Sequence, residues 1–200
     1  MFLTRKKIPV LPVCTIGAPE LSAVSQLVPA VDDRIRQLAE DMYRSLVAFD
    51  GIGLAAPQIG VNLRLVVFDV PEPEKDASEP LSPGEEILLP LMPFAAVNPE
   101  IVSYSQETAV RDEGCLSVPD LFAPVVRPRQ VLFRTSTLDG QMIECEAGGL
   151  LGRCIQHELD HLDGVLFTDR VSPETAAKIA ARLDKMRASG RRCNFRRTRR

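Results

Sequence analysis

The chain has 200 residues, which suffice for one compact domain with a hydrophobic core but are few for two. Hydrophobic residues make up 45% and charged residues 26%, so a disordered chain, a collagen and a coiled-coil rod are excluded. The net charge of −3 is uneven, because residues 191–200 hold six arginines and no acidic residue. Residues 1–190 carry a net charge of −9, which disfavours DNA as a partner.

Neither export nor membrane association is expected. No stretch approaches the roughly 18 uncharged apolar residues of a transmembrane helix, and the start of the chain lacks the apolar segment of a secretory signal. The cysteine number is odd and no Cys-x-x-Cys pair occurs, so we expect no disulfide framework and a reducing compartment. The five cysteines are Cys14, Cys115, Cys145, Cys154 and Cys193.

The first half of the chain predicts one helix and one strand. Apolar residues at helical spacing predict a helix over residues 31–49. The glycines of residues 51–60 indicate a loop or an irregular edge segment, and residues 63–70 are rich in Val, Leu and Phe, as in a strand. Residues 71–90 are rich in proline and acidic residues, which predicts a surface loop insertion.

The second half predicts short strands followed by two helices. The strands cover residues 95–102, 124–126, 131–138 and 142–146. Asp139-Gly140 is typical of the turn in a hairpin. Residues 149–162 have a helical period with Gly164 as C-cap, and a last helix runs from the N-cap Ser172 to Gly190.

These elements predict one α+β domain over residues 1–190. Mostly antiparallel strands pack around a central helix, with a further helix near each end. The Arg-rich residues 191–200 are expected to be a disordered tail, and contact with ribosomal RNA is a second interpretation of them.

The two histidines of the chain lie in Gln156-His-Glu-Leu-Asp-His161 on the predicted central helix. Residues four apart are one turn apart and about 40° around the axis, so both imidazoles reach one point. Glu158 lies near enough to address a water at that point, as in the His-Glu-x-x-His metal hydrolases. Two surface histidines at this spacing are the alternative.

A catalytic metal needs a third protein ligand and one open position. The candidates are Cys115, Cys145, Cys154 and the carboxylates after the helix. Buried cysteine is usually a small hydrophobe, which is the interpretation favoured for Cys145 and Cys154. Cys115 differs because it lies in a polar, glycine-containing segment, Glu113-Gly-Cys-Leu-Ser117.

Two other functions are compatible with the helix. In a zinc peptidase the third ligand would be acidic, Asp169 or Glu174, because Phe167 occupies the place where one protease class has a third histidine. A non-catalytic binding protein built on the same helix is the other. The intact Glu158 argues against it, since binding alone needs no base.

Three segments in order resemble the motifs of the peptide deformylase family. They are Gly51-Ile-Gly-Leu-Ala-Ala-Pro-Gln58, Glu113-Gly-Cys-Leu-Ser117 and Gln156-His-Glu-Leu-Asp-His161. The resemblance covers roughly residues 9–188. It implies a metal-dependent hydrolase of the bacterial cytoplasm that removes the formyl group from the N-terminal formyl-methionine of new polypeptides and releases formate.

The resemblance also implies roles for single residues. Cys115, His157 and His161 would bind one divalent ion, natively Fe²⁺, with Zn²⁺, Ni²⁺ or Co²⁺ as replacements. Glu158 would move the proton, and the Gln58 amide and the Leu116 backbone N–H would stabilise the oxyanion. The substrate peptide would contact Ile52, Gly53, Gly114 and Leu159. Glu113, Asp160 and Arg127 would orient the ligands, with Arg127 paired to Glu113.

Overall fold

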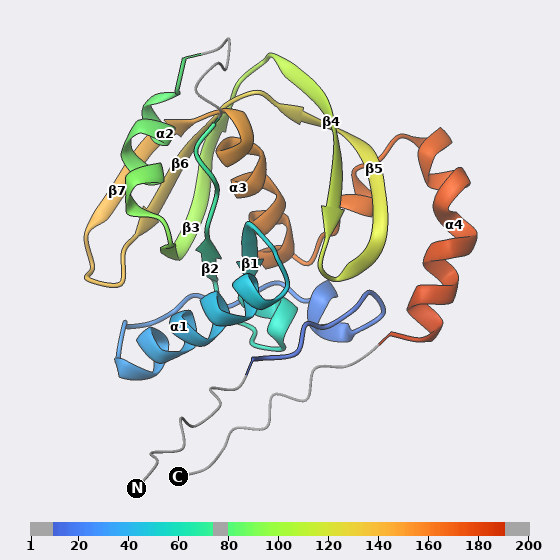
Figure 1. Cartoon of the computed structure of the whole chain (residues 1–200), viewed down its shortest axis with the longest axis horizontal. Coiled ribbons are helices and arrows are strands. Elements are labelled where there is room, and N and C mark those ends of the chain that lie inside the picture. Colours follow the sequence, from blue (N-terminus) through green and yellow to red (C-terminus); the bar gives the residue numbers. More distant parts are fainter. Residues whose placement is uncertain (1–9, 74–79, 191–200) are drawn as a thin grey trace, which may run out of the picture.

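The computed structural model describes residues 10–73 and 80–190, and it confirms the predicted α+β class. A five-stranded sheet and a separate two-stranded ribbon lie on either side of helix α3 (Gly149–Leu162), as Figure 1 shows. The predicted first and last helices are α1 (Asp33–Ala48) and α4 (Pro173–Ala188). The Arg-rich residues 191–200 lie outside the described residues.

The five-stranded sheet is antiparallel throughout and has the order β1-β2-β3-β6-β7. Its strands are β1 (Gly53–Ala55), β2 (Leu65–Phe68), β3 (Phe94–Tyr104), β6 (Val131–Ser136) and β7 (Met142–Ala147). The predicted strands and the hairpin around Asp139-Gly140 are therefore confirmed, with differences of a few residues at their ends.

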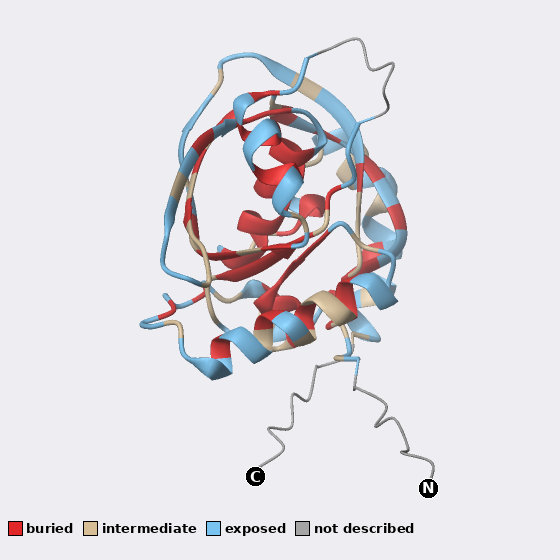
Figure 2. Ribbon diagram, turned by 60° about the vertical axis from the view of Figure 1, so that its left-hand side comes forward, coloured by how far each residue is buried: buried red, intermediate tan, exposed pale blue. Residues whose placement is uncertain are grey.

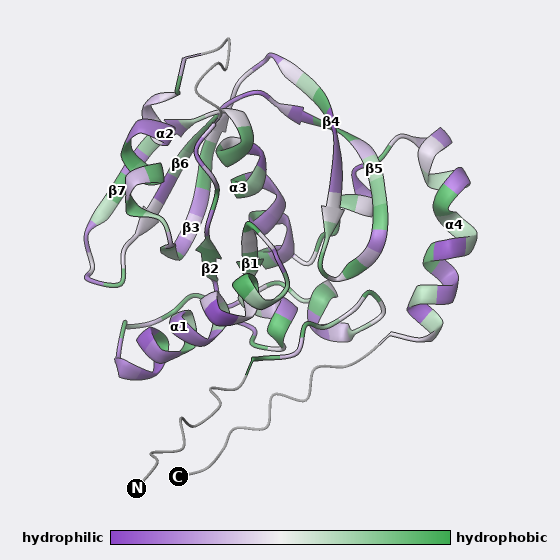
Figure 3. Cartoon of the chain, viewed as in Figure 1, coloured by the Kyte–Doolittle hydropathy of each residue, from purple (hydrophilic) through white to green (hydrophobic). Residues whose placement is uncertain are grey.

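Strand β2 is buried on both faces, which explains its continuous apolar sequence. Val66 and Phe68 belong to the apolar cluster around α3, whereas Leu65 and Val67 belong to the cluster around α1. Since neighbouring strand residues point to opposite faces, α3 and α1 cover opposite faces of the sheet. In Figure 3, β2 is strongly hydrophobic and much of α1 is hydrophilic, as expected for a helix that buries one side.

The ribbon consists of β4 (Thr108–Cys115) and β5 (Val118–Pro128). Sequence analysis predicted only residues 124–126 of it as strand. Strand β4 is largely exposed and carries consecutive charged residues, so it lacks the apolar alternation that marks a half-buried strand. On its inner face, β5 packs Leu121 and Val125 against Phe167 and Leu183.

Three further observations concern the sequence predictions. The predicted loop over 71–90 is wrong in its second half, where α2 (Pro83–Leu88) forms because Ser82 and Glu85 make a capping box. The structure departs from the expected absence of disulfides at Cys14, which is disulfide-bonded. Within the described residues, no helix is long and apolar enough to cross a membrane.

Buried residues gather in the interior between the sheet and the ribbon (Figure 2), and α3 runs through this interior. Every residue of α3 from Leu151 to Leu162 is buried. Ionisable side chains are rarely buried unless they are paired or bind a metal. The buried ionisable side chains of α3 are Arg153, Cys154, His157, Glu158, Asp160 and His161.

Candidate active site

Helix α3 and the end of β4 bring three metal-binding side chains together. His157 and His161 lie one turn apart, with ring centroids 5.1 Å from each other. The Cys115 Sγ lies 3.2 Å from Nε2 of His161. One ligand atom from each of the three residues lies within 4.8 Å of the others. A thiolate and two imidazoles suit a divalent transition metal and leave a fourth position open.

The other candidates for the third ligand do not join this cluster. Cys154 directs its Sγ to the Ile52 carbonyl, and Cys145 is part of the apolar core. Burial raises the pKa of both thiols, which favours the protonated form over the thiolate that binds metals. Asp169 accepts a hydrogen bond of 2.9 Å from the Leu166 N–H and caps a turn, while Glu174 pairs with Lys178 at the surface. The structure therefore brings neither acidic candidate to the histidines.

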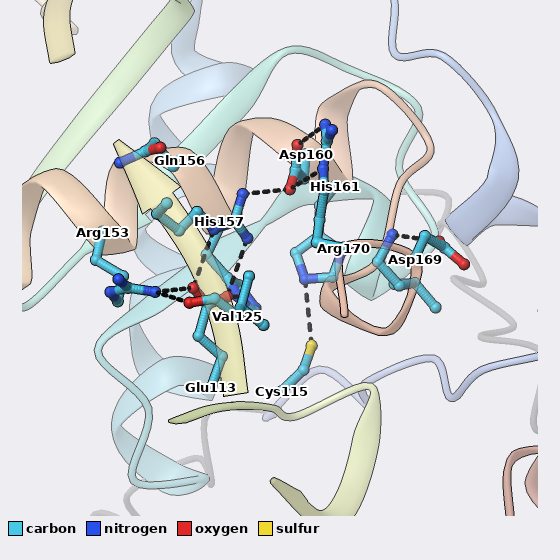
Figure 4. A network of polar contacts seen from close by, with 12 residues as sticks. Glu113, Cys115, Val125, Arg153, Gln156, His157, Asp160, His161, Asp169 and Arg170 are labelled. Carbon is cyan, nitrogen blue, oxygen red and sulfur yellow. Dashed lines mark hydrogen bonds and ion pairs between the residues drawn. The ribbon is translucent and has the colours of Figure 1, made fainter. Parts of the chain in front are cut away.

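Glu113, on β4, orients the His157 ring through a hydrogen bond at Nδ1. Its Oε2 lies 2.9 Å from Nδ1 of His157, which leaves Nε2 of that ring for a metal. Arg127 donates to both carboxylate oxygens at 2.9 Å, and Arg153 donates to Oε1 at 2.7 Å (Figure 4). Burial alone would raise the pKa of the Glu113 carboxyl, but the bonds from His157 and Arg127 hold it well below its usual range.

Arg153 is a functional candidate that sequence analysis missed. It lies one helical turn before His157 and is buried, and besides Glu113 it donates to the Val125 and Ala109 carbonyls. The available signal was an arginine four residues before a predicted ligand on a mostly apolar helix. Arg153 thus ties α3 to both strands of the ribbon.

The charges around the cluster favour a cation. Burial alone would raise the pKa of Cys115, but His161 and His157 hold it well below that of an ordinary thiol. Burial alone would lower the pKa of His157, but Cys115 and Glu113 raise it well above its ordinary value. Positive charge between these groups is therefore stabilised, whether a proton or a metal ion carries it.

Glu158 lies buried beside the cluster. Burial raises the pKa of its carboxyl, and its Oε2 has no hydrogen-bond partner among the described residues. A Cβ atom on Gly53 would meet Oε1 of Glu158 at 2.5 Å, so glycine lets β1 approach this carboxylate. A buried carboxyl with a raised pKa and an unused oxygen is suited to accept and return a proton.

Gln58 connects β1 with the ribbon. Its Oε1 accepts a hydrogen bond of 2.7 Å from the Ala55 N–H. Its Nε2 is therefore the donor, and it lies 3.3 Å from Ser117 Oγ and 3.6 Å from Cys115 Sγ. This buried amide donor faces the position beside the metal ligands.

A cavity of about 840 Å³ opens onto the cluster. The predicted site residues that line it are Ile52, Gly53, Gln58, Glu113, Gly114, Cys115, Leu116, His157 and Glu158. Leu159 does not line it and packs in the core, so its assignment to the substrate pocket is wrong. The reason is helical geometry, since two residues after His157 the helix has turned by about 200°. Sequence analysis missed the apolar lining residues Phe49, Phe122 and Leu150.

Comparison with known proteins decides the family. The sequence profile described as "Polypeptide deformylase" matches residues 10–177. The chain belongs to the peptide deformylase family. As a peptide deformylase it is a metal-dependent hydrolase that removes the N-formyl group from the N-terminal formyl-methionine of new polypeptides.

Similar deformylases cover most of the chain. Peptide deformylase 2 of Gloeobacter violaceus is 44% identical over 84% of this chain and 82% of its own length. The peptide deformylase of Cellvibrio japonicus is 41% identical over 90% and 97%. The crystal structure of the Ehrlichia chaffeensis deformylase has a TM-score of 0.77 at 36% identity and covers 90% of this chain and 98% of its own. A Synechococcus elongatus deformylase in complex with actinonin has a TM-score of 0.75 at 35% identity, over 92% and 91%.

Proposed function

We propose that Cys115, His157 and His161 hold the metal ion for deformylation and that Glu158 moves the proton. The observation that carries this proposal is one arrangement of α3 and β4. Three ligand atoms lie within 4.8 Å of one another, and a buried carboxylate lies beside them at a large cavity. The metal, when bound, polarises the formyl carbonyl and makes a water nucleophilic at neutral pH.

We propose Fe²⁺ as the native metal, with Zn²⁺, Ni²⁺ or Co²⁺ able to replace it. One thiolate and two imidazoles accept all four ions, so the donor set is compatible with each. Metal analysis of protein purified without oxygen tests the assignment. Stoichiometric iron supports it, and zinc in protein with full activity contradicts it.

Glu158 serves as base and then as acid. It takes a proton from the water that attacks the formyl carbon, and it returns that proton to the nitrogen of the leaving amine. The water oxygen remains in formate, and the C–N bond breaks. Burial raises the pKa of this carboxyl above its ordinary value, which supports the double role because a carboxyl that binds its proton more firmly can carry it to the leaving amine.

Gln58 and Leu116 stabilise the oxyanion that forms on the formyl oxygen. The Gln58 Nε2 faces the ligands, and Leu116 directly follows Cys115 and lines the cavity. The substrate lies extended along β1 and β4, with Gly53 and Gly114 allowing its backbone close approach and Ile52 contacting the methionine side chain. Leu159 is excluded from this pocket because its side chain packs in the core.

The location and the tail complete the proposal. We place the enzyme in the bacterial cytoplasm, where formylated nascent chains arise, and we treat residues 1–190 as its single catalytic domain.

We also propose a transient contact of residues 191–200 with ribosomal RNA, which only their six arginines support. Ribosome sedimentation with and without these residues tests it, and equal, salt-insensitive sedimentation contradicts it.

Formate release from a formyl-Met tripeptide by anaerobically loaded Fe²⁺ or Ni²⁺ protein tests the function. The same peptide with an acetyl group is the matched control substrate. We expect formate from the first peptide only, and loss of release in Glu158→Gln protein that still binds metal. Absence of release from fully metallated unmodified protein contradicts the proposal, and cleavage of an unformylated peptide would favour the peptidase.

A further inference from the structure

We infer that Arg170, which touches neither the metal site nor the catalytic cavity, is a positioning residue for the metal ligand His157. It would act through Asp160, Arg127 and Glu113. This inference rests on the metal site proposed above. It adds a surface-exposed residue to the set that determines how firmly the ion is held.

The connection starts at Arg170, in the segment that follows α3. Arg170 donates from Nε and Nη2 to the two oxygens of Asp160, at 3.2 and 2.8 Å (Figure 4). The same carboxylate accepts a bond of 2.6 Å from Nη1 of Arg127. Asp160 is therefore shared between two guanidinium groups, and bidentate pairs of this kind fix orientation as well as charge.

The connection ends at the metal site. Arg127 donates from Nε and Nη2 to the two oxygens of Glu113, and Glu113 holds Nδ1 of His157. Each carboxylate is thus bonded on two sides, and each step is a charged hydrogen bond of 3.2 Å or less. Displacement of Asp160 would let Arg127 turn, and Glu113 would lose one of the groups that orient it.

The fold places Arg170 for this task. An antiparallel bridge between Val125 and Val171 fixes the segment that carries Arg170 beside β5, the strand that carries Arg127. The side chain of Arg170 is 49% exposed, whereas those of Asp160 and Arg127 are 11% and 6% exposed. Arg170 is therefore the solvent-exposed end of an otherwise buried network.

A second cavity explains why removal of the Arg170 side chain should weaken the bonds of Asp160. This cavity, of about 420 Å³, lies behind α3 and is lined by Arg170, Asp160, Arg127 and Tyr104 among others. Without the Arg170 side chain, water in this cavity gains access to the Asp160 carboxylate. Water can then replace Arg127 as its partner, which loosens the connection to Glu113.

The test measures release of Co²⁺ from the full-length, Co²⁺-loaded enzyme to excess EDTA, followed by the visible spectrum of the bound ion. We expect about tenfold faster release from Arg170→Ala, the lower end of the effect usual for residues that support metal ligands. Arg170→Lys should recover part of the loss, since lysine restores the charge but not the fork of donors. The Co²⁺ spectrum of Arg170→Ala should also shift, because the orientation of His157 changes.

Arg134→Ala is the matched control. Arg134 also pairs with two carboxylates, Glu100 and Glu144, and its side chain is 40% exposed, but it is not connected to the metal site. The Arg134→Ala protein should release Co²⁺ at nearly the rate of the unmodified protein, because exposed ion pairs contribute little to stability. Equal release rates for Arg170→Ala, Arg134→Ala and the unmodified protein would overturn the inference.

A double-mutant cycle tests the route. In an Asp160→Asn background, Arg170→Ala should cause no further acceleration, and full additivity would contradict action through Asp160. If Arg170→Ala fails to fold, the same comparison is made with Arg170→Lys and Arg170→Gln, and unchanged release from both overturns the inference. Failure of the metal site itself is distinguishable, because the unmodified protein would then bind no Co²⁺.

Discussion

The two halves of the site are held in place by different forces. The α3 half packs Leu151 and Ile155 into the core formed with Phe68 and Phe133 of the sheet. The ribbon half meets α3 through buried ion pairs, in which Glu113 and Arg127 of the ribbon bond Arg153 and Asp160 of the helix. Its outer face remains exposed, as at Val110 and Val126.

The difference teaches how the ligand geometry is fixed. Apolar burial is not directional, so it holds α3 firmly but does not by itself set the position of Cys115 relative to the histidines. Buried ion pairs add little net stability, yet a pair with one partner removed is costly. We therefore expect changes in the helix core to affect stability first and changes in the ribbon network to affect metal affinity first.

The largest effect on activity is expected from a change at Glu158, which belongs neither to the apolar core of α3 nor to the ion pairs of the ribbon. Glu158→Gln keeps the size and polarity of the side chain and removes the proton acceptor. The rate of formate release should fall about 10²–10⁴-fold, the usual contribution of a general base. Metal content and the melting temperature should stay near those of the unmodified protein, and activity above a tenth of normal would reject the role.

Gln58 joins the sheet to the ribbon, so its loss tests the link between the halves. Gln58→Glu keeps the acceptor for the Ala55 N–H and removes the Nε2 donor. We expect about 10²–10³-fold lower kcat, as for loss of one oxyanion donor, with metal still bound. A raised KM at unchanged kcat would instead assign Gln58 to substrate binding.

Glu113→Gln breaks the attachment of the ribbon to His157. The neutral amide leaves Arg127 and Arg153 without their shared carboxylate, and metal affinity should fall about 10–100-fold. Competition with a chelator of known affinity measures it. Unchanged affinity would mean that the ribbon contributes Cys115 alone.

Leu151→Ala weakens the apolar packing that holds α3 in the core, and of these changes it should affect activity least. Leu151 is 1% exposed, and its truncation should lower the free energy of unfolding by about 2–5 kcal/mol, as measured in a denaturant titration. The kcat of the folded, metal-loaded enzyme should stay nearly normal. A large loss of metal in this variant, with stability unchanged, would reverse the comparison.

The sequence predicted the helix half better than the ribbon half. Helical period, the Gly164 C-cap and the His-Glu-x-x-His spacing are local signals, so α3 and its side chains could be placed from nearby residues alone. Cys115 could be singled out from its segment but was assigned as a ligand only through the family motif. Its approach to His161 depends on pairing of β4 with β5, which leaves no local periodic signal on β4.

The other misses have different causes. Arg153 and Arg170 find their partners on other elements, which spacing along the chain does not reveal. Leu159 was assigned to the substrate pocket through the family resemblance, although the helical turn directs it to the core. The helix α2 carried a local signal, the capping box of Ser82 and Glu85, but the proline-rich composition around it outweighed that signal.

The most direct test of the account is a Co²⁺ titration of the metal-free protein, with absorption and formate release recorded at each addition. The account predicts that both saturate at one equivalent, with a thiolate-to-cobalt absorption band that is absent from Cys115→Ser. That result would show that the ribbon and the helix share one catalytic ion. Saturation of activity without a thiolate band, or an identical band in Cys115→Ser, would contradict it.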